Sequence, residues 1–157
     1  MKLILVGKGA SGKDHLKNRL RKKGFKTGVS HTTRPPRVNE VDGVDYHFIE
    51  EYEFTEMVGR GEFIEWMDFN GGWYGQTEED FNGADVMIMS KEGLEMLPSK
   101  FREQAIVIYL DIDFLTRLER LNDRNDKNDE VHRRLKADDE QFKDLTDFDI
   151  RVMNPNF

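Results

Sequence analysis

One short segment constrains the fold of this chain more than any other feature: Gly7-Lys8-Gly9-Ala10-Ser11-Gly12-Lys13. It satisfies the G-x-x-x-x-G-K part of the phosphate-binding loop pattern, in which successive backbone N–H groups turn inward around a polyphosphate. An apolar run, residues 3–6, precedes it, and residues 13–23 follow with Leu16 and Leu20 four apart among charges. A strand and a helix joined by such a turn predict the start of a βαβ unit.

The residues around the end of this loop have predictable roles. The helix that begins at Lys13 adds its partial positive charge, and the ammonium group reaches the outer phosphates. Asp14 stands where Ser or Thr normally donates a hydroxyl to Mg²⁺. A carboxylate is a good ligand for Mg²⁺, so Asp14 is either a metal ligand or a first-turn residue favoured by the helix dipole. The alternative for the whole segment is an ordinary glycine-rich turn, which its position, flanks and spacing disfavour together.

The rest of the chain alternates strands and helices on both sides of a less regular block. Apolar runs predict strands at 86–89 and 105–110, and a final short strand is expected at 149–153. Helical spacing of apolar residues predicts helices at 113–122 and 128–142, and a short helix that ends near Pro98 is expected at 91–97. The block from residue 28 to about 81 has glycines, two adjacent prolines and aromatic residues, and it predicts a small mixed insertion. The order indicates an α/β core with a parallel sheet.

Length and charge exclude several classes of protein. A chain of 157 residues is expected to form one domain, and 24 basic against 31 acidic residues give a net charge of −7. An acidic chain is a poor non-specific binder of nucleic acid or anionic membranes. There is no cysteine and no apolar run long enough to span a membrane. We therefore expect a cytoplasmic domain with neither nucleic acid nor membrane as a partner.

A second group of segments suggests a site for another phosphate. Ser30-His31-Thr32-Thr33-Arg34-Pro35-Pro36-Arg37 concentrates hydroxyls and two arginines around rigid prolines, and arginine forks bind phosphate oxygens bidentately. Three aromatic segments follow: Asp45-Tyr46-His47-Phe48, Glu62-Phe63-Ile64-Glu65-Trp66 and Trp73-Tyr74-Gly75. Taken one at a time, an arginine pair favours a solvated face and the aromatic residues favour a core.

Together, these segments and the phosphate loop closely resemble guanylate kinases, in order and spacing, over residues 2–154. The Thr-Thr-Arg-Pro-Pro-Arg stretch, followed by Glu40 and Gly43, is the most specific part. The resemblance implies a single domain of P-loop NTPase type, with a parallel sheet flanked by helices. Its core would comprise 1–29 and 84–157, its monophosphate-binding insertion about 30–83, and its lid about 122–130.

The resemblance also implies an activity, namely transfer of the γ-phosphate of ATP to GMP or dGMP with Mg²⁺ as the cofactor. It makes Gly7 to Asp14 the ATP-binding residues, with Asp14 at the metal. It implies that the acceptor nucleotide is bound by the following residues: Ser30, Arg34, Arg37, Tyr46 and Tyr74 at the phosphate, Glu65 at the guanine edge, and Gln76 and Ser90 in the base pocket. It implies that the catalytic residues are Lys13, Arg34, Arg124 and Arg134.

The arginines near the lid have a simpler interpretation from the residues alone. Arg120, Arg124 and Arg133 could pair with the many nearby aspartates; the resemblance favours catalysis for Arg124 and Arg134 and leaves Arg120 open. Positive groups there make chemical sense, because phosphoryl transfer spreads negative charge over the equatorial oxygens.

Three positions depart from the family pattern. Besides Asp14, Ser90 replaces one carboxylate near the guanine, and Gln76 stands where Ser or Thr is preferred. Two alternatives therefore stay open. Ribose 1,5-bisphosphate phosphokinases have Asp after the loop lysine but lack the Thr-Thr-Arg-Pro-Pro-Arg segment, whereas non-catalytic guanylate-kinase-like modules have degraded phosphate loops. The preference between GMP and dGMP stays open, and we expect a monomer or weak homodimer.

Overall fold

The core of the molecule is a parallel sheet. The computed structural model describes residues 1–69, 71–123 and 128–157. The sheet has the order β6-β1-β7-β8, and its three pairings are all parallel. Its strands are β1 (Lys2–Gly7), β6 (Val86–Ile88), β7 (Ala105–Leu110) and β8 (Ile150–Val152). β1, β6 and β7 lie on the predicted apolar runs and β8 lies in the final short strand expected at 149–153, so the expected parallel α/β core is confirmed.

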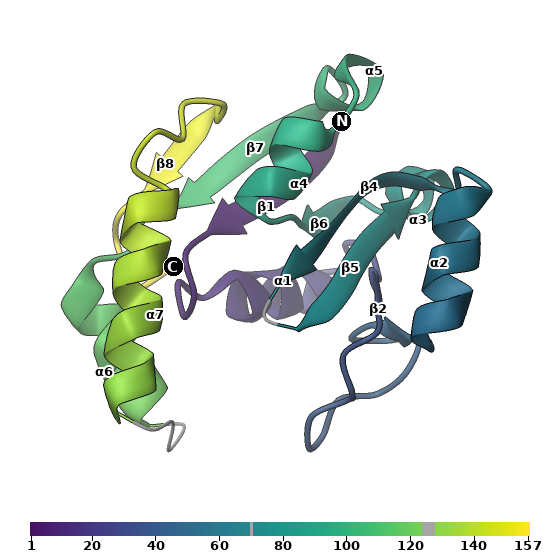
Figure 1. Ribbon diagram of the computed structural model, residues 1–157. Helices are drawn as coiled ribbons and strands as arrows, with labels where there is room; N and C mark the ends of the chain where they lie inside the picture. Colours follow the sequence, from purple (N-terminus) through teal and green to yellow (C-terminus); the bar gives the residue numbers. More distant parts are fainter. Residues whose placement is uncertain (70, 124–127) are drawn as a thin grey trace.

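Helices flank this sheet. They are α1 (Lys13–Lys22), α4 (Lys91–Met96), α5 (Ser99–Arg102), α6 (Phe114–Asn122) and α7 (Asn128–Gln141). Helix α1 packs against β1 and β6, and α6 and α7 lie side by side (Figure 1). All of them except α5 agree with predicted helices, since a four-residue helix is too short to show apolar periodicity. Among the described helices, none is both long and apolar enough to cross a membrane.

A second sheet, of order β3-β2-β5-β4, is built from the middle of the chain. Its strands are β2 (His31–Thr32), β3 (His47–Phe48), β4 (Phe63–Phe69) and β5 (Gly72–Thr77), accompanied by α2 (Glu51–Gly59) and α3 (Glu78–Gly83). Helix α2 lies on the side away from the core sheet (Figure 1). The sequence predicts only a mixed block here, because two-residue strands leave no alternation to detect.

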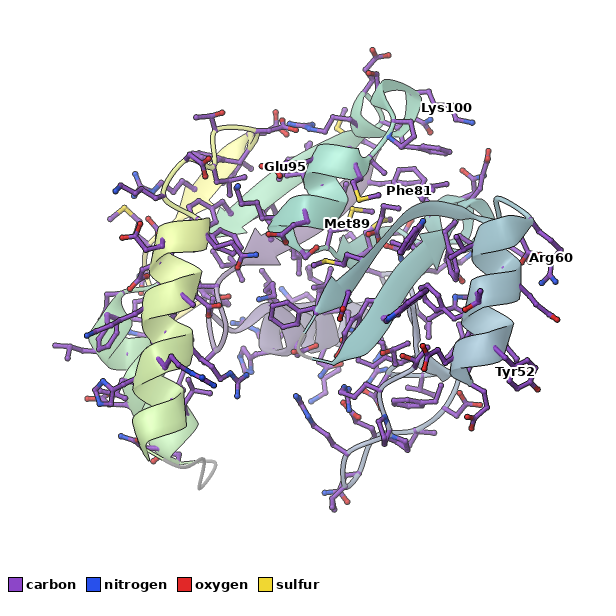
Figure 2. The ribbon with its side chains drawn as sticks, viewed as in Figure 1. Tyr52, Arg60, Phe81, Met89, Glu95 and Lys100 are labelled. Atoms are coloured by element: carbon purple, nitrogen blue, oxygen red, sulfur yellow. The ribbon has the colours of Figure 1, made fainter. Side chains whose placement is uncertain are left out.

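One hydrophobic cluster joins the two sheets. Ile4 and Val6 of β1 project to the same face and pack with residues of β6, β7 and α4. Figure 2 shows Phe81 and Met89 in the space between α4 and the β4–β5 pair, and both side chains are buried. Ile64 of β4 packs against this cluster, so the cluster connects the second sheet to the core sheet.

Candidate active site

The loop between β1 and α1 has the backbone shape that its sequence predicts. It begins as β1 ends at Gly7 and finishes as α1 begins at Lys13. Ala10 and Gly12 have φ values of 58° and 96°, which lie in the left-handed region. For alanine this conformation costs about 1–2 kcal/mol, and strain of this kind is concentrated at functional sites. The strand, loop and helix therefore give the phosphate pattern its required context.

The ammonium group of Lys13 folds back onto this loop. Its Nζ donates to the carbonyl oxygens of Gly7 at 2.5 Å and Lys8 at 3.0 Å. Burial lowers the pKa of Lys13, while the nearby carboxylates of Asp14 and Asp138 act in the opposite direction. A poorly solvated cation beside backbone N–H groups is a favourable place for a phosphate.

Charged side chains from α6 and α7 surround the loop. Lys8 Nζ lies 2.8 Å from a carboxylate oxygen of Asp139 on α7. Arg120 on α6 donates to the carbonyl oxygens of Ala10 at 3.0 Å and Pro155 at 3.1 Å. The two helices and the segment after β8 therefore fix the loop through polar contacts, and Arg120 contacts the loop directly.

Across from the loop, the second sheet gathers the expected phosphate ligands. Arg34 donates to the hydroxyl of Tyr74 at 3.1 Å and makes a forked contact with Glu40 at 2.9 and 3.0 Å. Its guanidinium also lies 5.4 Å from the centre of the Tyr46 ring. Burial, with help from the charge of Asp14, raises the pKa of Tyr46 to about 12. Asp14, in the first turn of α1, is therefore close enough to Tyr46 for its charge to act on the tyrosine hydroxyl.

Two buried polar side chains lie farther along the second sheet. Glu65 of β4 is opposite Gln76 of β5, so their side chains share one face. Glu65 is only 7% exposed, and this burial raises its pKa to about 7. Its carboxylate touches the first turn of α4, where a Cβ on Gly93 would lie 2.5 Å from Oε2. Ser90 reaches the same place, and its Oγ accepts from the Gly93 N–H at 2.9 Å.

Gln76 is the second of these buried polar side chains, and its amide group is unpaired. Its side chain is fully buried, and neither Oε1 nor Nε2 has a hydrogen-bond partner within the described ranges. Buried polar groups are normally paired, because an unpaired one costs about 1–3 kcal/mol. The buried carboxyl of Glu65 and the unpaired amide of Gln76 therefore place unused hydrogen-bonding capacity on one face of the β4–β5 pair.

Comparison with known proteins shows which family this chain belongs to. The family model for guanylate kinase matches residues 1–157. The guanylate kinase of Methylobacillus flagellatus is 34% identical over 140 residues, which cover 85% of this chain and 69% of that protein. The chain belongs to the guanylate kinase family. A second guanylate kinase, from Nostoc sp., is 30% identical over 164 residues, covering 99% of this chain and 82% of that protein.

The fold of the family is also recovered in a solved structure. The crystal structure of guanylate kinase from Anaplasma phagocytophilum matches with a TM-score of 0.70 at 22% identity, covering 98% of this chain and 76% of that one. The agreement confirms the predicted P-loop fold, with a parallel sheet flanked by helices.

In this member of the guanylate kinase family, the donor set around Asp14 fits Mg²⁺. Asp14 is exposed in the first turn of α1, beside Lys13. No group of three histidine or acidic residues in the described parts of the chain is arranged to hold a metal ion. Mg²⁺ is commonly bound by one or two carboxylates together with substrate phosphates and water. A single exposed carboxylate next to a phosphate loop is compatible with such a site.

The remaining predicted site residues of this guanylate kinase family member make fewer of these contacts. Arg37 is exposed and contacts Glu40 through its backbone N–H at 2.6 Å, while Ser30 is partly buried at the start of the second sheet. Arg134 is exposed on α7, and Arg124 lies outside the described residues. The binding roles of all the predicted residues stay predictions.

Sequence reasoning missed two residues beside the phosphate loop. Arg117 of α6 is fully buried, and Asp138 of α7 accepts a hydrogen bond from the Gly9 N–H at 2.8 Å. Neither residue belongs to a motif, and single charges within helices are usually solvated. Only the packing of α6 and α7 beside the loop brings them to the site.

Proposed function

We propose that this chain is an ATP-dependent guanylate kinase that transfers the γ-phosphate of ATP to GMP or dGMP, giving ADP and GDP or dGDP. The observation that carries the proposal is the joint placement of two sites. A phosphate loop with its lysine leads into α1, whose Asp14 acts on Tyr46 of the arginine–tyrosine cluster, and β4 of the same sheet as Tyr74 carries the buried carboxyl of Glu65.

The donor side has the groups that phosphoryl transfer needs. In the reaction, an oxygen of the acceptor phosphate attacks the γ-phosphorus, and the bond to the β-phosphate oxygen breaks. Lys13 supplies a positive charge at the loop, and Arg34 supplies a second one at the acceptor phosphate. Mg²⁺, held by Asp14 with phosphate and water oxygens, would neutralise part of the charge on ATP.

The residues proposed to bind the phosphate of GMP already lie together. The Arg34 guanidinium is oriented by Glu40 and Tyr74, so little side-chain freedom is lost when an anion binds. The raised pKa of Tyr46 keeps its hydroxyl protonated and able to donate. Arg37 lies exposed nearby and is free to add a second guanidinium. This arrangement favours a phosphate monoester beside the phosphate loop.

The pocket chemistry favours guanine as the base. Guanine presents N1–H and the 2-amino group side by side, and one carboxylate accepts from both. Adenine presents an acceptor at N1, which would face the Glu65 carboxylate with a lone pair against a negative charge. A buried polar group left unpaired discriminates strongly between substrates. A ribose bisphosphate has no base to reach the buried Glu65 carboxyl, so the position of Glu65 on β4 counts against a sugar-phosphate acceptor.

The test is a coupled assay of ATP consumption with GMP, dGMP, AMP, dTMP and ribose 1,5-bisphosphate. We expect GMP or dGMP to have the highest kcat/KM, and Glu65→Gln to narrow the gap to AMP. Lys13→Ala should abolish transfer without unfolding the protein. A wild type that prefers AMP, dTMP or the sugar phosphate contradicts the proposal, and so does full turnover by the Lys13 variant.

The role of Asp14 is tested by titrating Mg²⁺ in the same assay. If Asp14 ligates the metal, Asp14→Ser retains activity and Asp14→Ala requires a higher Mg²⁺ concentration. Equal Mg²⁺ dependence of the wild type and Asp14→Ala would leave Asp14 as a helix-terminus residue only.

A further inference from the structure

An aspartate of the chain itself occupies the phosphate loop. Asp138 of α7 accepts from the backbone N–H of Gly9 through Oδ2 at 2.8 Å. The contact is close, since a Cβ built on Gly9 would also lie 2.8 Å from that oxygen. A carboxylate oxygen on an N–H of this loop is in the kind of place that a phosphate oxygen takes.

A buried arginine next to Asp138, Arg117, has one guanidinium nitrogen that donates no hydrogen bond within the described ranges. Arg117 is fully buried; its Nε donates to the carbonyl oxygen of Ile112 at 3.0 Å, and Nη2 donates to Asp139 at 2.6 Å. Its Nη1 has no hydrogen-bond partner within the described ranges, yet it lies 3.7 Å from Oδ2 of Asp138. A small movement of one carboxylate would pair this buried N–H.

The carboxylate of Asp138 therefore has two donors within reach, the Gly9 N–H and the Arg117 Nη1. Its negative charge also acts on Lys13, because it opposes the lowering of the lysine pKa by burial. A triphosphate entering the loop would bring further negative charge to the same groups. Two anions at one set of donors compete, so the nucleotide favours a state in which Asp138 has moved away.

We propose that Asp138 is a built-in competitor of the nucleotide: it occupies the Gly9 N–H when the loop is empty and moves to Arg117 Nη1 when ATP binds. This inference rests on the proposed function, because it takes ATP as the ligand of the loop. The apparent affinity for ATP is then reduced by the fraction of molecules in which Asp138 blocks the loop.

The experiment is calorimetric titration of ATP with Mg²⁺ and without a monophosphate, so that binding is measured in the absence of turnover. Asp138→Asn keeps the size of the side chain and removes its charge. We expect its Kd for ATP to fall about fivefold or more relative to wild type. The matched control is Glu140→Gln, two residues along α7, which removes the same charge from a side chain that is 79% exposed. Its Kd should change by less than about twofold.

A second variant tests the movement to Arg117. Arg117→Met removes the alternative donor, so it should raise the Kd for ATP in the wild-type background and have a smaller effect when combined with Asp138→Asn. If Arg117→Met does not fold, the Asp138→Asn measurement decides the competition alone. Unchanged or weaker ATP binding by Asp138→Asn overturns the proposal, and so does an equal gain in Glu140→Gln. A wild type that binds ATP but phosphorylates no monophosphate contradicts only the proposed function.

Discussion

At the scale of single residues, Glu65 is a carboxyl group whose burial opposes its ionisation. Burial raises its pKa to about 7, so the folded protein holds a proton there that the unfolded chain releases near pH 4.5. The contribution of the protonated group to folding is present below about pH 4.5 and is lost as the pH rises through 7. Above pH 7 the folded protein must keep a charge in a buried pocket.

Glu65→Gln should therefore stabilise the protein without nucleotide at alkaline pH. We expect its free energy of unfolding to exceed that of wild type by about 1–3 kcal/mol at pH 8 and by much less at pH 4.5. Urea unfolding at the two pH values measures this difference. A difference that is the same at both pH values would show that ionisation of Glu65 is not its cause.

The same ionisation predicts the pH dependence of acceptor use. Only the carboxylate form accepts hydrogen bonds from both guanine donors, so kcat/KM for GMP in wild type should rise with pH and level off above about pH 7. In Glu65→Gln this rise should be absent, because the amide does not titrate. An identical rise in the variant would assign the titration to another group.

At the scale of elements, the first turn of α4 packs against the carboxyl of Glu65, which we propose binds the base. Ser90 caps the helix, and Gly93 leaves room for the Glu65 carboxylate, which lies where an alanine Cβ would go. Within a helix, Gly→Ala is normally stabilising by roughly 0.5–1 kcal/mol. In this turn the close approach of the carboxylate opposes that gain.

Gly93→Ala should therefore raise the KM for GMP by about tenfold, because strain of about 1–3 kcal/mol moves Glu65, and it should leave the KM for ATP unchanged. Gly83→Ala is the matched control, since a Cβ there meets nothing within 4 Å. Steady-state kinetics with each substrate varied in turn measures both effects. Equal effects of the two substitutions on the KM for GMP would show that Gly93 has no specific role in binding GMP.

At the scale of the whole molecule, the proposed donor and acceptor sites are carried by different sheets. The phosphate loop continues from β1 of the core sheet, whereas Arg34, Tyr74 and Glu65 belong to the second sheet or the loop after β2. The hydrophobic cluster with Phe81 and Met89 holds the sheets together (Figure 2). Substitutions in one sheet should therefore affect mainly one substrate.

Arg34→Ala tests this separation. We expect the KM for GMP to rise about 10- to 100-fold, because a lost charge-assisted hydrogen bond costs about 1.5–3 kcal/mol, with little change in the KM for ATP. Arg60→Ala is the control, because it removes the same charge from an exposed side chain paired with Glu62 in the same part of the chain. A rise in the KM for ATP instead would assign Arg34 to the other substrate.

The sequence by itself determined the features that depend on neighbouring residues. The phosphate loop, with Lys13 and Asp14, is readable because a loop's backbone shape follows from its glycines and flanking elements. The core strands are readable because buried parallel strands are short apolar runs. Arg34 is suggested by the arginines and hydroxyls of Ser30–Arg37, whereas Tyr46 and Glu65 are named only through the family resemblance, since they are separated along the chain and carry no local signal of a shared site.

The tertiary structure alone decided which charges meet. Burial of Glu65 against Gly93 depends on the packing of β4 on α4 and cannot be read from an alternating strand, which allows the side chain to point to solvent. The contact between Gly9 and Asp138 joins residues 129 positions apart. Such contacts escape sequence patterns because distance along the chain does not determine distance in space, and the pKa of a carboxyl depends on the groups that surround it after folding.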